Sequence, residues 1–167
     1  MAFLPGSALL GLLRVLAAIT PAASVSVTGR QLSVGSITTD NGAGGAISLT
    51  ADARDADPAG ADITLTGDLD SGNGAATVAG PITISSGGND DQLLLSNGGA
   101  TVTVSADGTT DNAISLTIPV QDSADEPLTL DAGPGAAGAG GAVTVGVVTA
   151  PAAVGSPKKS AMQLDGL

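Results

Sequence analysis

The sequence predicts an all-β protein built as a β-solenoid of about six stacked coils. Between residues 61 and 86, an aliphatic residue takes every second place in each run, and Thr, Ser or Asp takes most of the others. This period of two is typical of strands with one buried and one solvated face. Clusters of Gly, Asn and Asp separate the runs and accept the positive φ of tight turns. Phe3 is the only aromatic residue, so the core must be filled by Ala, Val, Ile and Leu.

The strand pattern occupies residues 25–150, which we interpret as one β-strand repeat domain. An antiparallel β-sandwich is the alternative architecture, but sandwiches of the immunoglobulin type usually centre on large aromatic residues. Stacked coils bury small aliphatic side chains without rings, so the solenoid is favoured. The runs that predict strands cover residues 24–28, 31–39, 46–51, 62–67, 81–86, 92–96, 100–105, 113–118, 127–131 and 142–148.

The two ends of the chain depart from this pattern. Residues 1–24 combine an apolar run with small residues after it, which predicts either a secretory signal peptide or a helix that caps the core. Arg14 interrupts the run, and a central arginine costs about 2.5–3.5 kcal/mol on insertion scales, which argues against a transmembrane helix. Residues 151–167 lose the alternation and contain Lys158 and Lys159, so we expect a flexible, solvated tail.

The chain is strongly acidic, with 16 acidic residues against 5 basic ones and a formal net charge of −11. No Lys or Arg occurs from residue 55 to residue 157. Nucleic-acid binding depends on basic side chains that neutralise phosphates and on aromatics that stack on bases, so this class is excluded. Cys and His are absent from the sequence. The remaining metal ligands are oxygen atoms, which suit Ca²⁺ or Mg²⁺.

Two acidic segments are candidate calcium sites. Residues 87–95, GGNDDQLLL, resemble a nonapeptide that binds Ca²⁺ in β-rolls, with Asp90 and Asp91 as the candidate ligands. Gln92 stands where that motif has its key aspartate, so an ordinary polar turn is the alternative. Asp55 and Asp57 belong to a second cluster, for which a solvated acidic loop is the alternative because it lacks the closing Glu of an EF-hand.

Catalysis is not expected from this set of residues. A Ser-His-Asp triad cannot form without His. Paired carboxylates hydrolyse glycosides in other proteins, but the predicted strands contain no aromatic residue that would grip a sugar. We therefore predict no enzymatic activity, no small-molecule substrate and no cofactor other than Ca²⁺ at the two segments above.

Outward-facing hydroxyl rows are a second kind of candidate surface. Thr64 with Thr66 and Thr101 with Thr103 form T-x-T pairs. Flat arrays of such pairs on β-solenoids order water in some antifreeze proteins. Alternating Thr is also what a solvated strand face prefers, so both interpretations stay open.

Four segments in the repeat domain resemble the strand repeats of filamentous-haemagglutinin-like bacterial surface proteins. The resemblance spans about residues 30–150 and implies a right-handed parallel β-helix, secretion across the outer membrane and adhesion. It also implies that this chain is a fragment of a larger adhesin, with adjacent repeats as neighbours. The matching segments are ADITLTGDL (61–69), AGPITISSG (79–87), IPVQDSADEPLTLDAGPG (118–135) and GGAVTVGVV (140–148).

The sequence thus predicts a non-catalytic structural or adhesive module of a secreted or cell-surface repeat protein. Its expected partners are host or neighbouring cell-surface molecules, which it would contact through a rigid, acidic, hydroxyl-rich surface. The alternative is a β-solenoid domain that binds a ligand, either dependent on Ca²⁺ or specific for ice or carbohydrate.

Overall fold

A computed structural model describes residues 13–15, 24–39, 44–52, 62–72, 78–88, 91–108, 110–122, 126–133, 140–146, 148–149 and 162–165. Its regular elements are strands, and in this part of the chain no helix is long and apolar enough to cross a membrane. The strands are β1 (Leu13–Val15), β2 (Val25–Gly29), β3 (Leu32–Val34), β4 (Ile37–Thr38), β5 (Ile47–Ala51), β6 (Ile63–Leu65), β7 (Leu69–Asp70), β8 (Ile82–Ser86), β9 (Leu93–Leu95), β10 (Val102–Ser105), β11 (Ile114–Leu116), β12 (Val120–Asp122), β13 (Leu128–Asp131), β14 (Val143–Val145), β15 (Val148–Thr149) and β16 (Met162–Asp165).

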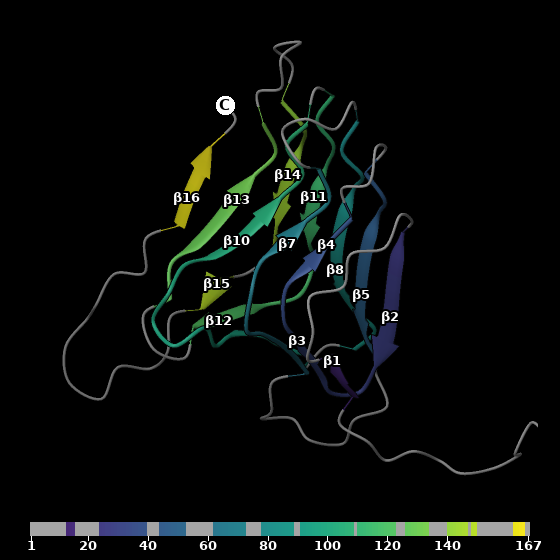
Figure 1. The fold of residues 1–167 in the computed structure, drawn as a ribbon. Helices are drawn as coiled ribbons and strands as arrows, with labels where there is room; N and C mark the ends of the chain where they lie inside the picture. Colours follow the sequence, from purple (N-terminus) through teal and green to yellow (C-terminus); the bar gives the residue numbers. More distant parts are fainter. Residues whose placement is uncertain are drawn as a thin grey trace, which may run out of the picture.

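The strands form three parallel sheets that run along a common axis (Figure 1). Sheet A has the order β1-β3-β6-β9-β12-β15, sheet B the order β4-β7-β10-β13-β16, and sheet C the order β2-β5-β8-β11-β14. Within each sheet the neighbours follow chain order, and each connects to the next by a crossover through the other two sheets. The chain is therefore a right-handed parallel β-helix, as predicted. The antiparallel sandwich is wrong, because the pairings between described strands are parallel.

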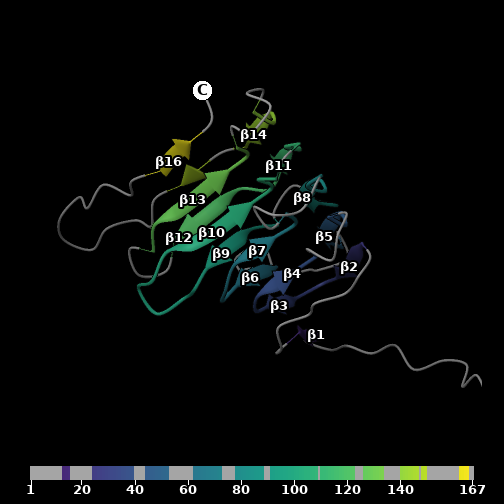
Figure 2. The same ribbon diagram turned by 45° about the horizontal axis from the view of Figure 1, so that its top comes forward.

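Each coil of the helix contributes one strand to sheet C, then one to sheet A and one to sheet B. The complete coils are β2–β4, β5–β7, β8–β10, β11–β13 and β14–β16, and β1 precedes them in sheet A. The described residues thus hold five complete coils and one extra strand, close to the expected six. Figure 2 shows the coils stacked from β2 at one end of the molecule to β14 and β16 at the other.

The core is a set of aliphatic columns inside the three sheets. The first aliphatic residues of four predicted strands, Ile63, Ile82, Val102 and Leu128, are 0%, 0%, 0% and 6% exposed. In sheet C the register places Ile82 between Ile47 and Ile114. Because side chains alternate across a strand, this register turns the polar residues of the same strands outward. Ala, Val, Ile and Leu make up the hydrophobic core cluster, as expected from a domain without rings.

Small polar and apolar residues fill the corners that follow β4, β7, β10 and β13 of sheet B. Thr39, Ser71, Ala106 and Ala132 take equivalent places there and are at most 1% exposed. The Thr39 hydroxyl donates to the Gly45 carbonyl at 2.5 Å, and the Ser71 hydroxyl donates to the Gly80 carbonyl at 2.5 Å. These hydrogen bonds satisfy carbonyl groups that the corner removes from the sheet ladder.

The ends of the chain contain strands that the sequence pattern did not predict. Leu13–Val15 pairs with β3, inside the segment predicted as a signal peptide or capping helix. Met162–Asp165 pairs with β13, with Met162 opposite Leu128, inside the segment predicted as a flexible tail. The other residues of 1–23 and of 150–167 lie outside the described part of the chain.

Candidate functional site

The calcium candidate Asp91 is a buried turn residue. Its side chain is 3% exposed, and its Oδ2 accepts hydrogen bonds from the Ser86 hydroxyl and from the Gly88 amide, both at 2.8 Å. The Ser86 hydroxyl also contacts the Gly88 carbonyl. Asp91 thus closes the turn that follows β8, in the way that Asp side chains commonly stabilise turns.

The other predicted calcium ligands are not placed by the structure. Asp90, Asp55 and Asp57 lie outside the described residues. Within the described ranges, no three acidic side chains gather into a group that would hold a metal ion. Calcium binding at these segments therefore stays a prediction, and the contacts of Asp91 support the alternative, a polar turn.

Two further buried carboxylates connect neighbouring coils. Asp62 is 3% exposed, and its Oδ2 accepts the Gln92 amide of the next coil at 2.8 Å. Glu126 is also 3% exposed, and its Oε1 accepts the amides of Asn97 and Gly99 in the previous coil at 3.1 and 3.3 Å. Both side chains accept hydrogen bonds from main-chain amides of a neighbouring coil, and hydrogen bonds to a charged group are stronger than neutral ones. The only signal in the sequence is their position just before the strands β6 and β13.

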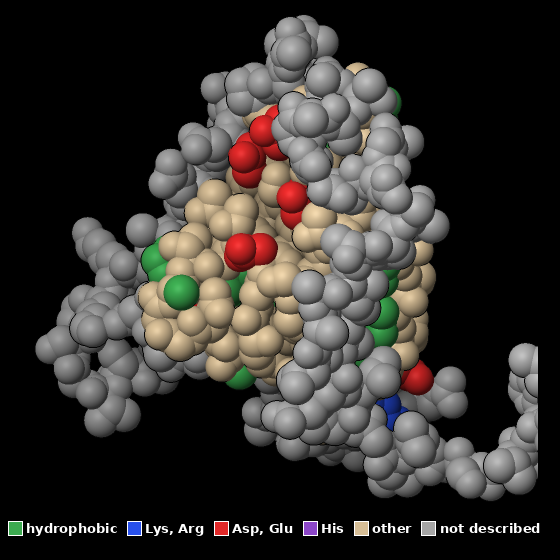
Figure 3. All heavy atoms as spheres, in the orientation of Figure 1, with side chains coloured by type: hydrophobic (Ala, Val, Ile, Leu, Met, Phe, Trp, Pro, Cys, Tyr) green, Lys and Arg blue, Asp and Glu red, His purple; other side chains and the backbone are tan. Residues whose placement is uncertain are grey.

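Acidic side chains gather on the outer face of sheet B, as Figure 3 shows. The outward ladder there contains Asp70, Ser105 and Asp131 in successive coils. Asp107 lies beyond the end of β10, where burial raises the pKa of its carboxyl group; the charges of Asp131 and Asp111 and a hydrogen bond with Asp111 raise it further. This face is therefore negatively charged and self-repelling.

The outer face of sheet C has a different chemistry, because its outward positions carry hydroxyl groups. One column of hydroxyl residues passes through all five strands, and a second runs beside it. Neighbouring rungs of such a column lie about 4.8 Å apart, and residues two apart on one strand lie about 6.6 Å apart. The columns are Ser26–Ser48–Thr83–Ser115–Thr144 and Thr28–Thr50–Ser85.

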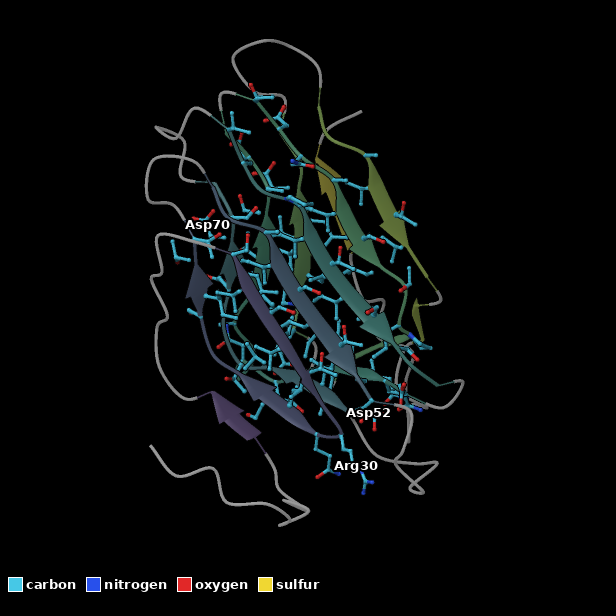
Figure 4. All side chains as sticks on the ribbon, turned by 90° about the vertical axis from the view of Figure 1, so that its right-hand side faces the viewer. Arg30, Asp52 and Asp70 are labelled. Carbon is cyan, nitrogen blue, oxygen red and sulfur yellow. The ribbon has the colours of Figure 1, made fainter. Side chains whose placement is uncertain are left out.

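The side chains of this hydroxyl face are partly solvated and partly bonded to one another. Ser26, Thr28 and Thr144 are exposed, and the hydroxyls of the middle rungs are half-buried by their neighbours. The Thr50 and Ser85 hydroxyls lie 3.2 Å apart and share a hydrogen bond. Figure 4 looks onto this sheet. Arg30 and Asp52 lie together at the carboxyl ends of β2 and β5, and Asp70 lies on the opposite side, toward the amino ends of these strands.

The T-x-T pairs singled out in the sequence do not form this face. Thr64 lies on sheet A, where the same ladder continues to Leu94, and the Thr66 hydroxyl donates to the Val34 carbonyl at 3.2 Å. Thr103 lies on sheet B, opposite Thr129. The two pairs therefore belong to different sheets. The hydroxyl face of sheet C was missed because it mixes Ser with Thr and becomes continuous only through the register.

No protein-family model, curated protein or solved structure matches this chain. The resemblance to filamentous-haemagglutinin-like proteins therefore stays a prediction. The arrangement of the described residues is the basis for assigning a function.

Proposed function

We propose that this chain is a non-catalytic structural and adhesive module whose contact surface is the hydroxyl face of sheet C. The observation that carries the proposal is the continuous hydroxyl column from Ser26 to Thr144, in register through five strands. A parallel β-helix holds such a column on a hydrogen-bonded backbone, so its groups are positioned before any ligand arrives. Preorganisation of this kind lowers the entropic cost of binding.

The chemistry of the face favours a neutral, hydroxyl-rich partner such as a cell-surface polysaccharide. Each Ser or Thr hydroxyl offers one donor and two acceptor lone pairs, and a sugar hydroxyl offers the same. The described outward positions of this ladder carry no charge, unlike the acidic ladder of sheet B. A single hydroxyl contact is weak, but a linear polymer that meets successive rungs gains by multivalency.

The three buried carboxylates support a structural role over a catalytic one. Asp62, Asp91 and Glu126 each accept main-chain amides and each are 3% exposed. A catalytic acid or base must reach a substrate proton, whereas these groups face the protein's own turns.

We further propose that the module belongs to a secreted or surface-displayed repeat protein, with host or neighbouring cell-surface molecules as partners. An aliphatic parallel β-helix is what the resemblance to filamentous-haemagglutinin-like proteins implies, and the chain has this architecture. A bacterial outer-membrane location follows from that resemblance alone.

A pull-down with insoluble cellulose and chitin tests the adhesive face. The variant S48A/T83V removes two adjacent hydroxyls from sheet C, and S33A/T64V removes the same two hydroxyl types from adjacent rungs of sheet A. The side chains of all four positions are half-buried, so the pairs are matched. Loss of two hydrogen bonds, each worth about 0.5–1.5 kcal/mol, should weaken binding at least about fivefold in the sheet C variant alone. Equal affinity of the two variants, or no retention of the wild type on either polymer, would refute the proposal.

Ice is the second candidate ligand, favoured by the regular two-column spacing of the same hydroxyl face. Ordered water presents a repeating lattice, and a rigid array with fixed rungs can match it without charged groups. An ice-recrystallisation assay distinguishes the candidates: if large crystals grow as fast with the wild-type protein as in buffer without protein, ice is ruled out. Inhibition that survives in S48A/T83V would place any ice contact elsewhere.

A further inference from the structure

The two ends of sheet C differ from its middle in how well they bury the core. The inward residues of β5, β8 and β11 are 0% exposed, for example Leu49, Ile84 and Leu116. In the terminal strands, Val27 of β2 and Val145 of β14 are only partly buried against the core. Figure 2 places β2 and β14 at opposite ends of the stack. Both ends of the apolar column are thus partly open to solvent.

The two terminal strands have matching sequences. β2 begins Val-Ser-Val, and β14 is Val-Thr-Val. Pairing β14 of one copy with β2 of the next, in the register used inside the molecule, would set Val143 beside Val25 and Val145 beside Val27. Thr144 would then continue the hydroxyl column into Ser26. An unpaired sheet edge offers the amide and carbonyl groups that such pairing needs.

We propose that the ends of the β-helix are an interaction surface for a second copy of this chain, and that copies associate head to tail. The proposed contact, between β14 of one copy and β2 of the next, repeats the parallel pairing that joins β2 to β5 and β11 to β14 within the chain. A two-fold arrangement of two β14 strands would instead make them antiparallel, unlike the parallel pairings between the described strands of this sheet. The contact is therefore heterologous, and it can extend beyond a dimer.

Sheet B can join the same contact. Its end strands are β4 and β16, and the Cα register runs from Ile37 through Leu69, Val104 and Leu130 to Leu164. In sheet A, β1 occupies the rung that β15 of a neighbouring copy would take. Two copies therefore meet through sheets C and B. In sheet A, either β1 of one copy or β15 of the other is displaced.

The net charge sets how this association should depend on salt. Each copy carries a formal charge of −11, so copies repel one another at low ionic strength. At about 1 M salt the Debye length falls to about 3 Å, which screens this repulsion while hydrophobic contacts persist. Head-to-tail association should therefore increase with added NaCl, whereas association through ion pairs would decrease.

The experiment is sedimentation velocity on the full chain over a concentration series, at low and high NaCl, with V27E and V145E. Each variant places a charge in one end of the apolar column and leaves the other end intact. The matched controls are S26E and T144E, which place the same charge on the outward side of the same strands. Circular dichroism melts verify that the variants fold.

The wild type and both controls should form species larger than the monomer, and V27E and V145E should each remain monomeric when alone. An equimolar mixture of V27E and V145E should form a dimer and nothing larger, because one intact β14 end meets one intact β2 end. This rescue also shows that both variants are folded. A monomeric wild type at every concentration and salt level would overturn the proposal. Dimers of V27E alone, or of V145E alone, would overturn it in favour of a two-fold contact.

Discussion

Replacing Ile84 by Ala tests the physical basis of the fold, which is a dry aliphatic column between stacked coils. Ile84 is 0% exposed and lies between Leu49 and Leu116 in the middle of sheet C. Removing three carbons loses about 2.4 kcal/mol of transfer free energy at about 0.8 kcal/mol per CH₂. A cavity term is added, because hydrogen bonds hold adjacent strands about 4.8 Å apart and keep the coils from collapsing into the space. We expect the free energy of unfolding to fall by about 3–4 kcal/mol.

Urea unfolding followed by far-UV circular dichroism measures this loss. Thr83→Ala is the matched control, since Thr83 is the adjacent residue on the outward side of β8; its cost should stay below about 1 kcal/mol, the range of strand propensities. Val145→Ala, in the partly open terminal rung, should fall between the two. If Ile84→Ala and Thr83→Ala lowered the free energy of unfolding equally, the inward assignment of the column would be refuted.

Four further outcomes are expected. Glu126→Ala should lower the free energy of unfolding by about 1–3 kcal/mol in urea titrations, because two main-chain amides lose their charged acceptor. The raised pKa of Asp107 means that the fold penalises its ionised form, so the contribution of this group to stability should fall as pH rises above 3.8. D107N should therefore be the more stable protein in melts at neutral pH but not below pH 3.8. Gly133→Ala should lower the melting temperature more than Gly98→Ala does. Both glycines have positive φ, but a Cβ at Gly133 would lie 2.2 Å from the Asp111 carboxyl carbon, whereas a Cβ at Gly98 would have no heavy atom within 4 Å. Millimolar Ca²⁺ should leave the melting temperature unchanged, and a rise that D91N abolishes would restore the calcium site at Asp91.

The sequence was sufficient to predict the fold class and the buried side of most strands. Alternation alone identified Ile47, Ile63 and Ile82 as inward residues, because a period of two needs no knowledge of the neighbouring strand. A strand with a single aliphatic residue shows no alternation, so the pattern does not reveal it. β7 (Leu69–Asp70) and β12 (Val120–Asp122) were missed for this reason, although each is one of the three strands of its coil.

Long-range register could not be predicted, and the candidate surface depends on it. The coil that leads from Val25 to Ile47 contains far fewer residues than the coil that leads from Ile47 to Ile82, because the loops at the corners differ in length. Without a constant period, no count along the chain shows that Ser48 stands beside Thr83. The hydroxyl face and the matching ends of sheet C became visible only when the strands were paired in space.

The acidity of the chain also has a structural explanation, which competes with its interpretation as a set of metal ligands. Corners and turns take main-chain amides out of the sheet ladder, and each buried amide needs another acceptor. Carboxylates are strong acceptors for this purpose. In the described ranges this role is filled repeatedly, by Asp62, Asp68, Asp70, Asp91, Asp111, Glu126 and Asp131.

Each of these carboxylates supports a turn or joins one coil to the next through a main-chain amide. Asp68, for example, accepts the Thr103 amide of the following coil at 2.8 Å, and Asp131 accepts the Gly133 amide at 3.0 Å. A β-helix with many short corners therefore accumulates aspartate for reasons of backbone hydrogen bonding. The same residues leave the net charge strongly negative, which repels other copies and keeps the end-to-end contact dependent on ionic strength.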